Sequence, residues 1–299
     1  MSVYYSAAKI NLFLQVEGKR SDGYHELTSI MQSVSLFDRM EISFEQDQYH
    51  LDCGDVDLGP VEKNIITRMW QLLKSEFDLP GEISVTVEKN IPVGAGLAGG
   101  SGNGAALLRA VKDQFCLELS SEDIVRLSAT VGADIAFCYF GGTMLATGIG
   151  EKLNPLPALP DCDILLFNGG FHVSTPEIFH AYDEIALGVE KAPPEVMLHA
   201  LEQGNMEGIL YGLYNGLEQV AFPRYASLRN LSDALDRLAL PHLMSGSGPS
   251  VFAFASPGAV KSFRENPRPE LGKMFCVHPL AKGIYTEKEY EALQQEHHF

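Results

Sequence analysis

The chain has 299 residues, of which 45% are hydrophobic and 20% are charged, a composition that supports a packed core and excludes wholesale disorder. Its 22 Lys and Arg stand against 39 Asp and Glu, so the formal net charge of −17 argues against a protein that coats nucleic acid. Small anionic ligands are not excluded, because backbone N–H groups and metal ions bind them without an excess of basic side chains.

Cysteine usage and the N-terminus indicate the compartment. The five cysteines show no C-x-x-C pair and no nearby histidine at zinc spacing, which is typical of reduced thiols in a cytosolic protein and predicts no metal site. The first residues lack the build of a signal peptide, and no apolar run approaches the ~18–20 residues of a membrane span. We therefore expect a cytoplasmic protein with no membrane partner and no nucleic-acid partner.

The first third of the chain has the pattern of strands. Polar and apolar residues largely alternate over 9–16, 40–44 and 83–87, which is the period of a half-buried strand. Between the last two ranges, apolar residues recur at helical spacing from residue 65 onward, directly after Asn64, a residue type suited to an N-cap. We expect strands over the three ranges and a helix that begins at residue 65.

A glycine-rich stretch, 90–104, runs directly into a helical pattern that starts at Ala105. A second helix is expected from Ser120 or Ser121, where serine is followed by acidic first-turn residues. Three prolines lie within 153–160, which makes this segment the best candidate for a linker. At roughly 150 residues per domain, we expect two domains, 1–154 and 155–299.

The second half mixes helical and strand patterns. A strand is expected over 163–167, helices over 194–202 and 227–238, and a buried strand over 251–254 after a second glycine-rich loop at 244–250. The residues from Thr286 onward are rich in Glu and Gln and predict a solvated helix or a loose end.

The first glycine-rich loop is the strongest local signal. Glycines allow backbone N–H groups to approach an oxyanion, and the helix that follows adds its positive end, so phosphate binding is favoured over a tight turn without a ligand. The loop is no Walker motif because the required lysine is absent. Gly94 to Gly99 satisfies G-x-G-x-x-G, but no acidic residue follows at the distance that a dinucleotide-binding fold requires.

Two charged residues are candidates for catalysis. Asp134 precedes an apolar run, where partial burial could tune it as a base or fix it against a cation, although a helix N-cap explains it equally well. Lys9 lies among apolar residues of an early strand and could pair with that carboxylate or with a phosphate, although a lone strand lysine more often faces solvent.

Two further segments are weaker candidates. The loop at 244–250 repeats the anion-binding pattern, yet a turn before a strand explains it equally well. Tyr24 and His25 could stack and bind a base, or they could anchor a packed loop. Trp70 is expected in the core.

Taken in order, three segments resemble the motifs of the GHMP kinase superfamily: 8–12, 92–104 and 244–250. The segments 22–27, 132–134 and 148–151 narrow the likeness to the branch that phosphorylates a cytidine diphosphate ester of a methylated tetritol in isoprenoid precursor biosynthesis by the non-mevalonate route. The resemblance implies an α+β fold of two domains, with an N-terminal ATP-binding domain, a ferredoxin-like C-terminal domain and the active site between them.

The resemblance also implies roles for single residues. Asp134 would be the catalytic base, and Lys9 would hold its carboxylate ionised and stabilise the forming alkoxide. ATP would be the co-substrate, with Mg²⁺ bridging its phosphates. The residues that would wrap the ATP phosphates are Pro92, Val93, Gly94, Ala95, Gly96, Leu97, Ala98, Gly99, Gly100, Ser101, Gly102 and Asn103.

The substrate end follows the same resemblance. Tyr24 and Phe179 would sandwich the cytosine, His25 would hydrogen-bond it, and Asn11 would also contact the substrate. The small-molecule partners are thus ATP and the cytidine diphosphate ester, bound by a monomer or a homodimer. The competing readings are a kinase of the same superfamily that acts on another alcohol, and a nucleotide-binding protein without catalysis.

Four positions depart from the family pattern. The loop usually reads G-L-G-G-G-S-S, whereas this chain has Ala98 in place of a glycine and Gly102 in place of a serine. Gly104 stands where alanine is usual, and Ala136 stands where proline commonly follows the catalytic aspartate. The expected base and lysine are untouched by these changes.

Overall fold

The computed structural model of the protein describes residues 1–56, 58–185 and 191–297. The strands in this part of the chain are β1 Ser2–Lys19, β2 His25–Gln46, β3 His50–Asp52, β4 Glu82–Glu88, β5 Thr143–Gly148, β6 Lys152–Pro155, β7 Asp163–Asn168, β8 Tyr214–Asn215, β9 His242–Met244, β10 Ser250–Ala255, β11 Lys273–Val277 and β12 Ile284–Thr286. The α-helices are α1 Ile65–Phe77, α2 Gly99–Gln114, α3 Ser121–Val131, α4 Ile135–Phe140, α5 Thr175–Ile185, α6 Glu195–Glu202, α7 Met206–Tyr211, α8 Glu218–Arg224, α9 Ala226–Arg237, α10 Pro257–Glu265 and α11 Glu287–His297. Short 3-10 turns lie at Val61–Lys63 and Pro269–Leu271.

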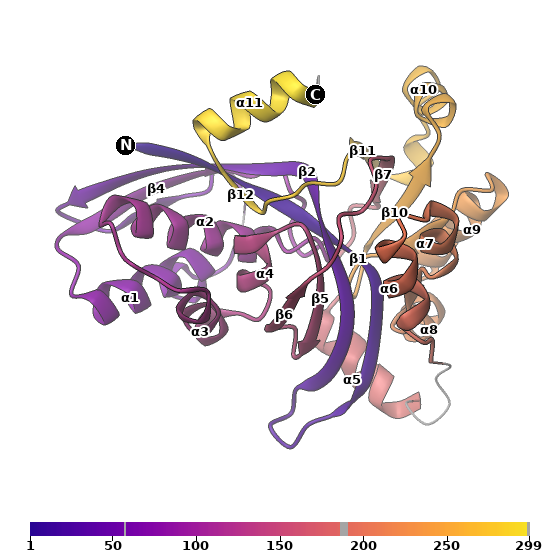
Figure 1. Cartoon of the computed structure of the whole chain (residues 1–299), viewed down its shortest axis with the longest axis horizontal. Helices are drawn as coiled ribbons and strands as arrows, with labels where there is room; N and C mark the ends of the chain where they lie inside the picture. Colours follow the sequence, from indigo (N-terminus) through magenta and orange to yellow (C-terminus); the bar gives the residue numbers. More distant parts are fainter. Residues whose placement is uncertain (57, 186–190, 298–299) are drawn as a thin grey trace.

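The first sheet is built on a long antiparallel hairpin of β1 and β2 (Figure 1). Its strand order is β12-β1-β2-β4-β3, with β5 added to β2, β6 added to β5, and β8 added to β1. Because successive side chains of a strand point to opposite faces, β1 contributes residues to both faces of the sheet. Tyr4 packs with α1–α4, whereas its neighbour Tyr5 stacks on Tyr290 of α11. The sheet therefore lies between α1–α4 and α11 (Figure 1).

The second sheet has the order β11-β7-β10-β9 and is antiparallel throughout. One face carries Leu166 and Phe252, which pack in one cluster with Ile10 and Leu12 of β1. The other face is covered by residues of α5, α8, α9 and α10. This shared cluster packs the second sheet against the middle of β1. From there on, α1–α4 no longer cover the hairpin.

The structure confirms most of the expected elements. Asn64 and Ser120 cap α1 and α3 through their side chains, and Trp70 is buried. The helix expected from Ala105 begins earlier, at Gly99, inside the glycine-rich stretch. The tail after Thr286 forms α11, and β12 and α11 return to the first sheet. The domain boundary after residue 154 stays a prediction.

Among the described residues, no helix is both long enough and apolar enough to cross a membrane.

Replacing Gly104 by alanine should destabilise the protein. A Cβ at this position would lie 2.6 Å from Cγ2 of Ile65 in α1, far inside van der Waals contact. Overpacking of this kind costs about 1–3 kcal/mol, which outweighs the roughly 1 kcal/mol that alanine gains over glycine inside a helix. Gly100 offers the matched control, since its added Cβ would meet Ile65 at an ordinary 3.5 Å. Urea unfolding should show Gly104→Ala as less stable than wild type and Gly100→Ala as no less stable; the reverse order would refute the packing argument.

Glu218→Gln should stabilise the protein in a pH-dependent way. Burial raises the pKa of Glu218 to about 7, despite the hydrogen bond that its carboxylate accepts from the N–H of Met244. As pH rises from about 4.5 to 7, the unfolded chain releases a proton that the folded chain retains, so the wild type loses up to about 3 kcal/mol. A glutamine keeps the acceptor without this loss.

The measurement is urea unfolding at pH 5 and at pH 8. We expect the gain in stability of Glu218→Gln to be small at pH 5 and about 1–3 kcal/mol at pH 8. Glu207→Gln, a change at an exposed carboxylate, is the control and should show no such difference. An equal gain at both pH values would exclude the titration of Glu218 as the cause.

Candidate active site

One cavity of about 540 Å³ collects the side chains expected to bind substrate and to catalyse. They reach it from β1, from the start of β2, from the segment before α4, and from α5. The expected residues on its wall are Lys9, Asn11, Tyr24, His25, Asp134 and Phe179. Residues from both halves of the chain therefore form one site.

Lys9 and Asp134 meet at this cavity although they lie far apart in the sequence. The Lys9 ammonium lies 3.8 Å from Oδ2 of Asp134 and donates a 2.7 Å hydrogen bond to Oδ1 of Asn11. The amide of Asn11 donates in turn to the hydroxyl of Ser29, which fixes its orientation. Lys9 is only 5% exposed, so the alternative of a solvent-facing strand lysine is wrong.

Asp134 occupies the N-cap position of α4 but does not act as a cap. Its side chain accepts no hydrogen bond from the helix N-terminus. Instead the carboxylate lies beside Lys9 and is 37% exposed. The carboxylate is thus available to a bound molecule and is paired with one cation.

The first glycine-rich loop lines a second cavity of about 490 Å³. Gly96, Ala98 and Thr175 lie on the walls of both cavities, so the two adjoin. Ala98 precedes α2 with a φ of +56°, the left-handed region that favours glycine, and offers no side-chain cap. The first N–H groups of α2 are consequently left for an anionic ligand. The side chains of Ala95 and Leu97 are buried, so the loop presents mainly backbone there.

The two glycine-rich loops interlock. A Cβ at Gly96 would lie 2.2 Å from the carbonyl oxygen of Ser245, so only glycine permits this approach. The hydroxyl of Ser245 donates a 3.0 Å hydrogen bond to the carbonyl of Gly96. Behind the second loop, the amide of Asn215 donates to the carbonyls of Met244 and Gly246, each at 2.8 Å. The second loop is therefore a fixed wall of the site.

A buried network holds the first loop from behind. The Asp38 carboxylate is fully buried and accepts hydrogen bonds from the N–H groups of Asn90 and Ile91, from the ammonium of Lys89 and from the amide of Asn103. Asn103 also donates to the hydroxyl of Ser6. Its amide is thus committed to the protein interior, although the residue lines the second cavity. Its expected contact with ATP stays a prediction.

The departures at 102 and 104 have a packing reason. A Cβ at Gly102 would lie 3.2 Å from Cβ of Ser6, tighter than an ordinary contact. At Gly104 the obstacle is Ile65. Here α2 lies close to both β1 and α1, and glycine is the residue that fits. Nothing in the structure explains alanine instead of proline at position 136.

At the far end of the first cavity, a charged network orients His25. Its Nε2 lies 2.6 Å from Oδ1 of Asp183, and Oδ2 of Asp183 accepts a 2.6 Å hydrogen bond from Lys19. Burial acts to raise the pKa of Asp183, but the hydrogen bonds from Lys19 and His25 outweigh it and hold the pKa below its usual value. The ring of His25 lies 4.9 Å from that of Phe179, centroid to centroid, whereas Tyr24 is 61% exposed.

The sequence interpretation missed Asp183 and Asp38. Asp183 lies one helical turn after Phe179 on α5, so the i, i+4 spacing could have pointed to it. Asp38 carries no such signal, because its partners lie 51 to 65 residues away along the chain.

Comparison with known protein families assigns two parts of the chain to the GHMP kinases. Residues 64–142 match the GHMP kinases N terminal domain, and residues 197–271 match the GHMP kinases C terminal domain. These two matches contain the first glycine-rich loop, Asp134 and the second glycine-rich loop.

Three similar proteins are named as kinases of the same cytidine diphosphate ester. A 4-diphosphocytidyl-2-C-methyl-D-erythritol kinase of Listeria innocua is 39% identical over 96% of this chain and 97% of its own length. One of Clostridium acetobutylicum is 37% identical over 83% of this chain and 88% of its own. The crystal structure of a 4-(cytidine 5'-diphospho)-2C-methyl-D-erythritol kinase is 31% identical, covers 93% of this chain and 98% of its own, and superimposes with a TM-score of 0.75. This protein therefore belongs to the 4-diphosphocytidyl-2-C-methyl-D-erythritol kinase family of the GHMP kinases.

Proposed function

We propose that the protein transfers the γ-phosphoryl group of ATP to the 2-hydroxyl of 4-diphosphocytidyl-2-C-methyl-D-erythritol, a step of non-mevalonate isoprenoid precursor biosynthesis. The names of its relatives support the substrate and the reaction class. The observation that carries the mechanism is the pairing of Lys9 and Asp134 in the first cavity, which adjoins the cavity of the first glycine-rich loop.

In the proposed step, the Asp134 carboxylate accepts the proton of the 2-hydroxyl as its oxygen attacks the γ-phosphorus. The bond between that phosphorus and the β,γ-bridging oxygen breaks, and ADP leaves. Lys9 pairs with the Asp134 carboxylate and stabilises the negative charge that grows on the attacking oxygen. Because Asn11 holds the Lys9 ammonium in place, little reorganisation is needed during the reaction.

ATP would lie in the second cavity, with its phosphates over residues 92–103 and the N-terminus of α2. Lys63 and Lys89 line the same cavity, but the Lys89 ammonium is paired with Asp38. The site therefore offers few free positive charges to a triphosphate, which fits a need for Mg²⁺. The hydroxyl of Ser101 and the carboxylate of Asp134 are the oxygen donors suited to such a hard cation. When bound, Mg²⁺ would neutralise charge on the phosphates.

The cytosine would lie between Tyr24 and Phe179, beside His25. Nε2 of the imidazole lies against the Asp183 carboxylate, so a His25 tautomer with its proton on Nε2 would donate to Asp183 and present Nδ1 as an acceptor. The exocyclic amine of cytosine supplies a matching donor, whereas uracil has a carbonyl oxygen at that place. Asp183 is thus proposed as a positioning residue that sets which base His25 can accept.

We further propose that the enzyme works in the cytoplasm as a monomer or homodimer, without a nucleic-acid partner. The scattered free cysteines and the acidic composition support this setting. We place the boundary of its two domains after residue 154, before the last residue of β6 and within a proline-rich segment.

Asp134→Asn should abolish most of the activity while leaving the affinity for the cytidine substrate intact, because an amide cannot accept the hydroxyl proton. Loss of a general base typically lowers kcat by about 10²–10⁴-fold. Steady-state formation of ADP with 4-diphosphocytidyl-2-C-methyl-D-erythritol measures kcat, and isothermal titration calorimetry measures the affinity for each substrate. Asp161→Asn, an exposed change on the wall of neither cavity, is the control.

An Asp134→Asn enzyme as active as wild type would end the assignment of the base. Absence of turnover by the folded wild-type protein with Mg²⁺ would end the kinase assignment itself. Turnover of another alcohol in preference to the cytidine ester would favour a different kinase of the same superfamily.

Asp183→Asn should raise KM for the cytidine substrate by about ten- to a hundredfold with a smaller effect on kcat, because a charge-assisted hydrogen bond is worth roughly 1.5–3 kcal/mol. It should also narrow the preference for the cytidine over the uridine analogue, since the tautomer of His25 is no longer fixed. Glu184→Gln is the neighbouring control, because Glu184 pairs with Arg224 and does not line the cavity. An unchanged KM and base preference would show that Asp183 serves only the fold.

A further inference from the structure

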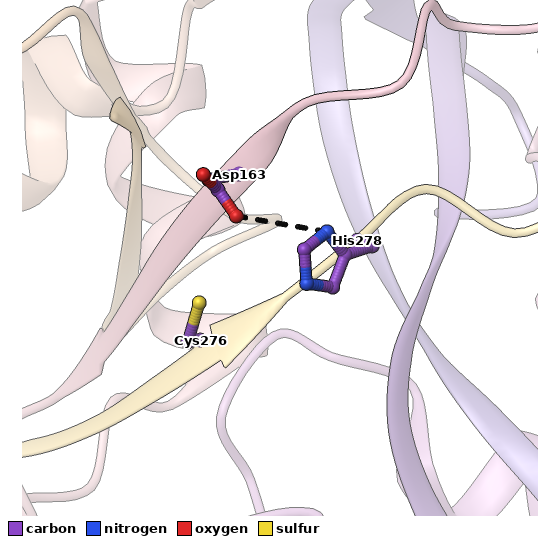
Figure 2. A group of neighbouring side chains, drawn as sticks. All are labelled: Asp163, Cys276 and His278. Atoms are coloured by element: carbon purple, nitrogen blue, oxygen red, sulfur yellow. Dashed lines mark ion pairs between the residues drawn. The ribbon is translucent and has the colours of Figure 1, made fainter. Parts of the chain in front are cut away.

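We propose that Asp163, Cys276 and His278 form a binding site for a divalent transition-metal ion of the Zn²⁺ type. Their side chains gather where β7 begins and β11 ends (Figure 2). One ligand atom of each residue lies within 4.8 Å of the ligand atoms of the other two. Nδ1 of His278 is 3.8 Å from Oδ1 of Asp163. The sequence predicted no metal site, because a Cys-x-His pair is shorter than the usual zinc spacings.

The register of two strands brings the three residues together. Cys276 and His278 are two residues apart along one extended segment, so their side chains leave from the same face. In this antiparallel pair, Val277 lies opposite Ile164. His278, which follows Val277, therefore lies opposite Asp163, which precedes Ile164. Neighbouring strands are about 4.8 Å apart, so side chains that lie opposite each other on one face are within reach of one another.

The backbone of His278 is anchored from the first sheet. Its N–H donates a 2.8 Å hydrogen bond to the hydroxyl of Ser35 in β2, and its carbonyl accepts one of 3.0 Å from the N–H of Ser35. His278 therefore stands at the point where the chain crosses from the second sheet to the first. A metal ion held here would tie β7 and β11 to that crossing.

The donor set selects the type of ion. Sulfur, nitrogen and oxygen together suit a borderline ion such as Zn²⁺ or Co²⁺, rather than Mg²⁺ or Ca²⁺, which prefer oxygen alone. A thiolate, a carboxylate and a neutral imidazole carry two negative charges, which balance those of the ion. The Cys276 thiol gives its proton to water as the sulfur–metal bond forms. Asp163 and His278 are about one-fifth to one-quarter exposed, which leaves room for a water molecule as fourth ligand.

The site is separate from the proposed catalytic machinery. None of its three residues lines the cavity of Lys9 and Asp134 or the cavity of the first glycine-rich loop. Arg264 of α10 lies beside the Cys276 sulfur as a hydrogen-bond donor, so its guanidinium competes with a cation for this atom. We therefore expect the ion to stabilise the fold without taking part in phosphoryl transfer.

Co²⁺ is the probe, because its bond to a thiolate gives an absorption band that nitrogen and oxygen ligands alone do not produce. We expect chelator-treated full-length protein to bind one Co²⁺ with this band, Zn²⁺ to displace it, and Zn²⁺ to raise the Tm. Cys276→Ser should lose the band. Asp163→Asn and His278→Gln should keep it but weaken binding at least about tenfold. Arg264→Gln should bind at least as tightly as wild type.

The neighbouring thiol supplies the matched control. Cys162 is half-buried and directly precedes Asp163, yet it is not part of the cluster. Cys162→Ser should retain the band and the affinity, and thermal melts with chelator should show that every variant is folded. Wild-type protein without a thiolate band, or a band lost with Cys162→Ser and kept with Cys276→Ser, would overturn the assignment.

Discussion

The buried carboxylate of Asp38 is the constraint on which the site depends. A charge in a dry interior costs several kcal/mol unless donors surround it, and here two backbone N–H groups, one ammonium and one amide do so. Removing one partner of such a pair costs about 3–5 kcal/mol, so the donors cannot move independently. Because two of these donors are the N–H groups of Asn90 and Ile91, the start of the first glycine-rich loop is fixed to β2.

From this anchor the geometry extends to the reacting groups. Asn103 joins the Asp38 network to Ser6 in β1, and the N–H of Lys9 donates to the carbonyl of Leu97 at the other end of the loop. The strand that carries the proposed catalytic lysine and the loop proposed to hold ATP are thus one rigid unit. Gly96 extends the unit to the second half of the chain, since its contact with Ser245 admits no side chain. The loop proposed to hold ATP and the packing of the two halves are therefore linked at a single glycine.

Sequence reasoning succeeded where the signal was local. Asn64 and Ser120 indicate the starts of their helices because a cap acts within a few residues. The glycine density of 92–104 marks a special backbone, although the residues from Gly99 onward already belong to α2. The sequence marked Lys9 and Asp134 as candidates, but only the family resemblance favoured catalysis, since neither residue has a local feature that decides between catalysis and a simpler role. The fold had to bring them together before the alternatives could be separated.

What the sequence could not supply is the long-range fit. The need for glycine at 104 arises from Ile65, a residue of another helix, and no pattern within α2 reveals it. Asp183 becomes meaningful only when β1 and the start of β2 place Lys19 and His25 against α5. In the same way, Cys276 and His278 appear unrelated to Asp163 until the register of β7 and β11 is known. Tertiary packing determines which residues meet across a sheet or between helices, whereas secondary-structure propensity depends on a few residues that are neighbours in the sequence.

The net charge of −17 has a different meaning once the site is built. Two anions are proposed to meet in these cavities, yet the Lys89 ammonium is neutralised by Asp38, and Lys9 is shared with Asp134. In the proposed complex, the attraction for phosphate would therefore come mainly from backbone N–H groups at the start of α2 and from a cation that arrives with ATP. A site of this kind adds almost no net positive charge to the protein. The acidic composition and the proposed binding of anionic substrates are consequently compatible, because the first describes the whole surface and the second would depend on a few oriented dipoles and a metal ion.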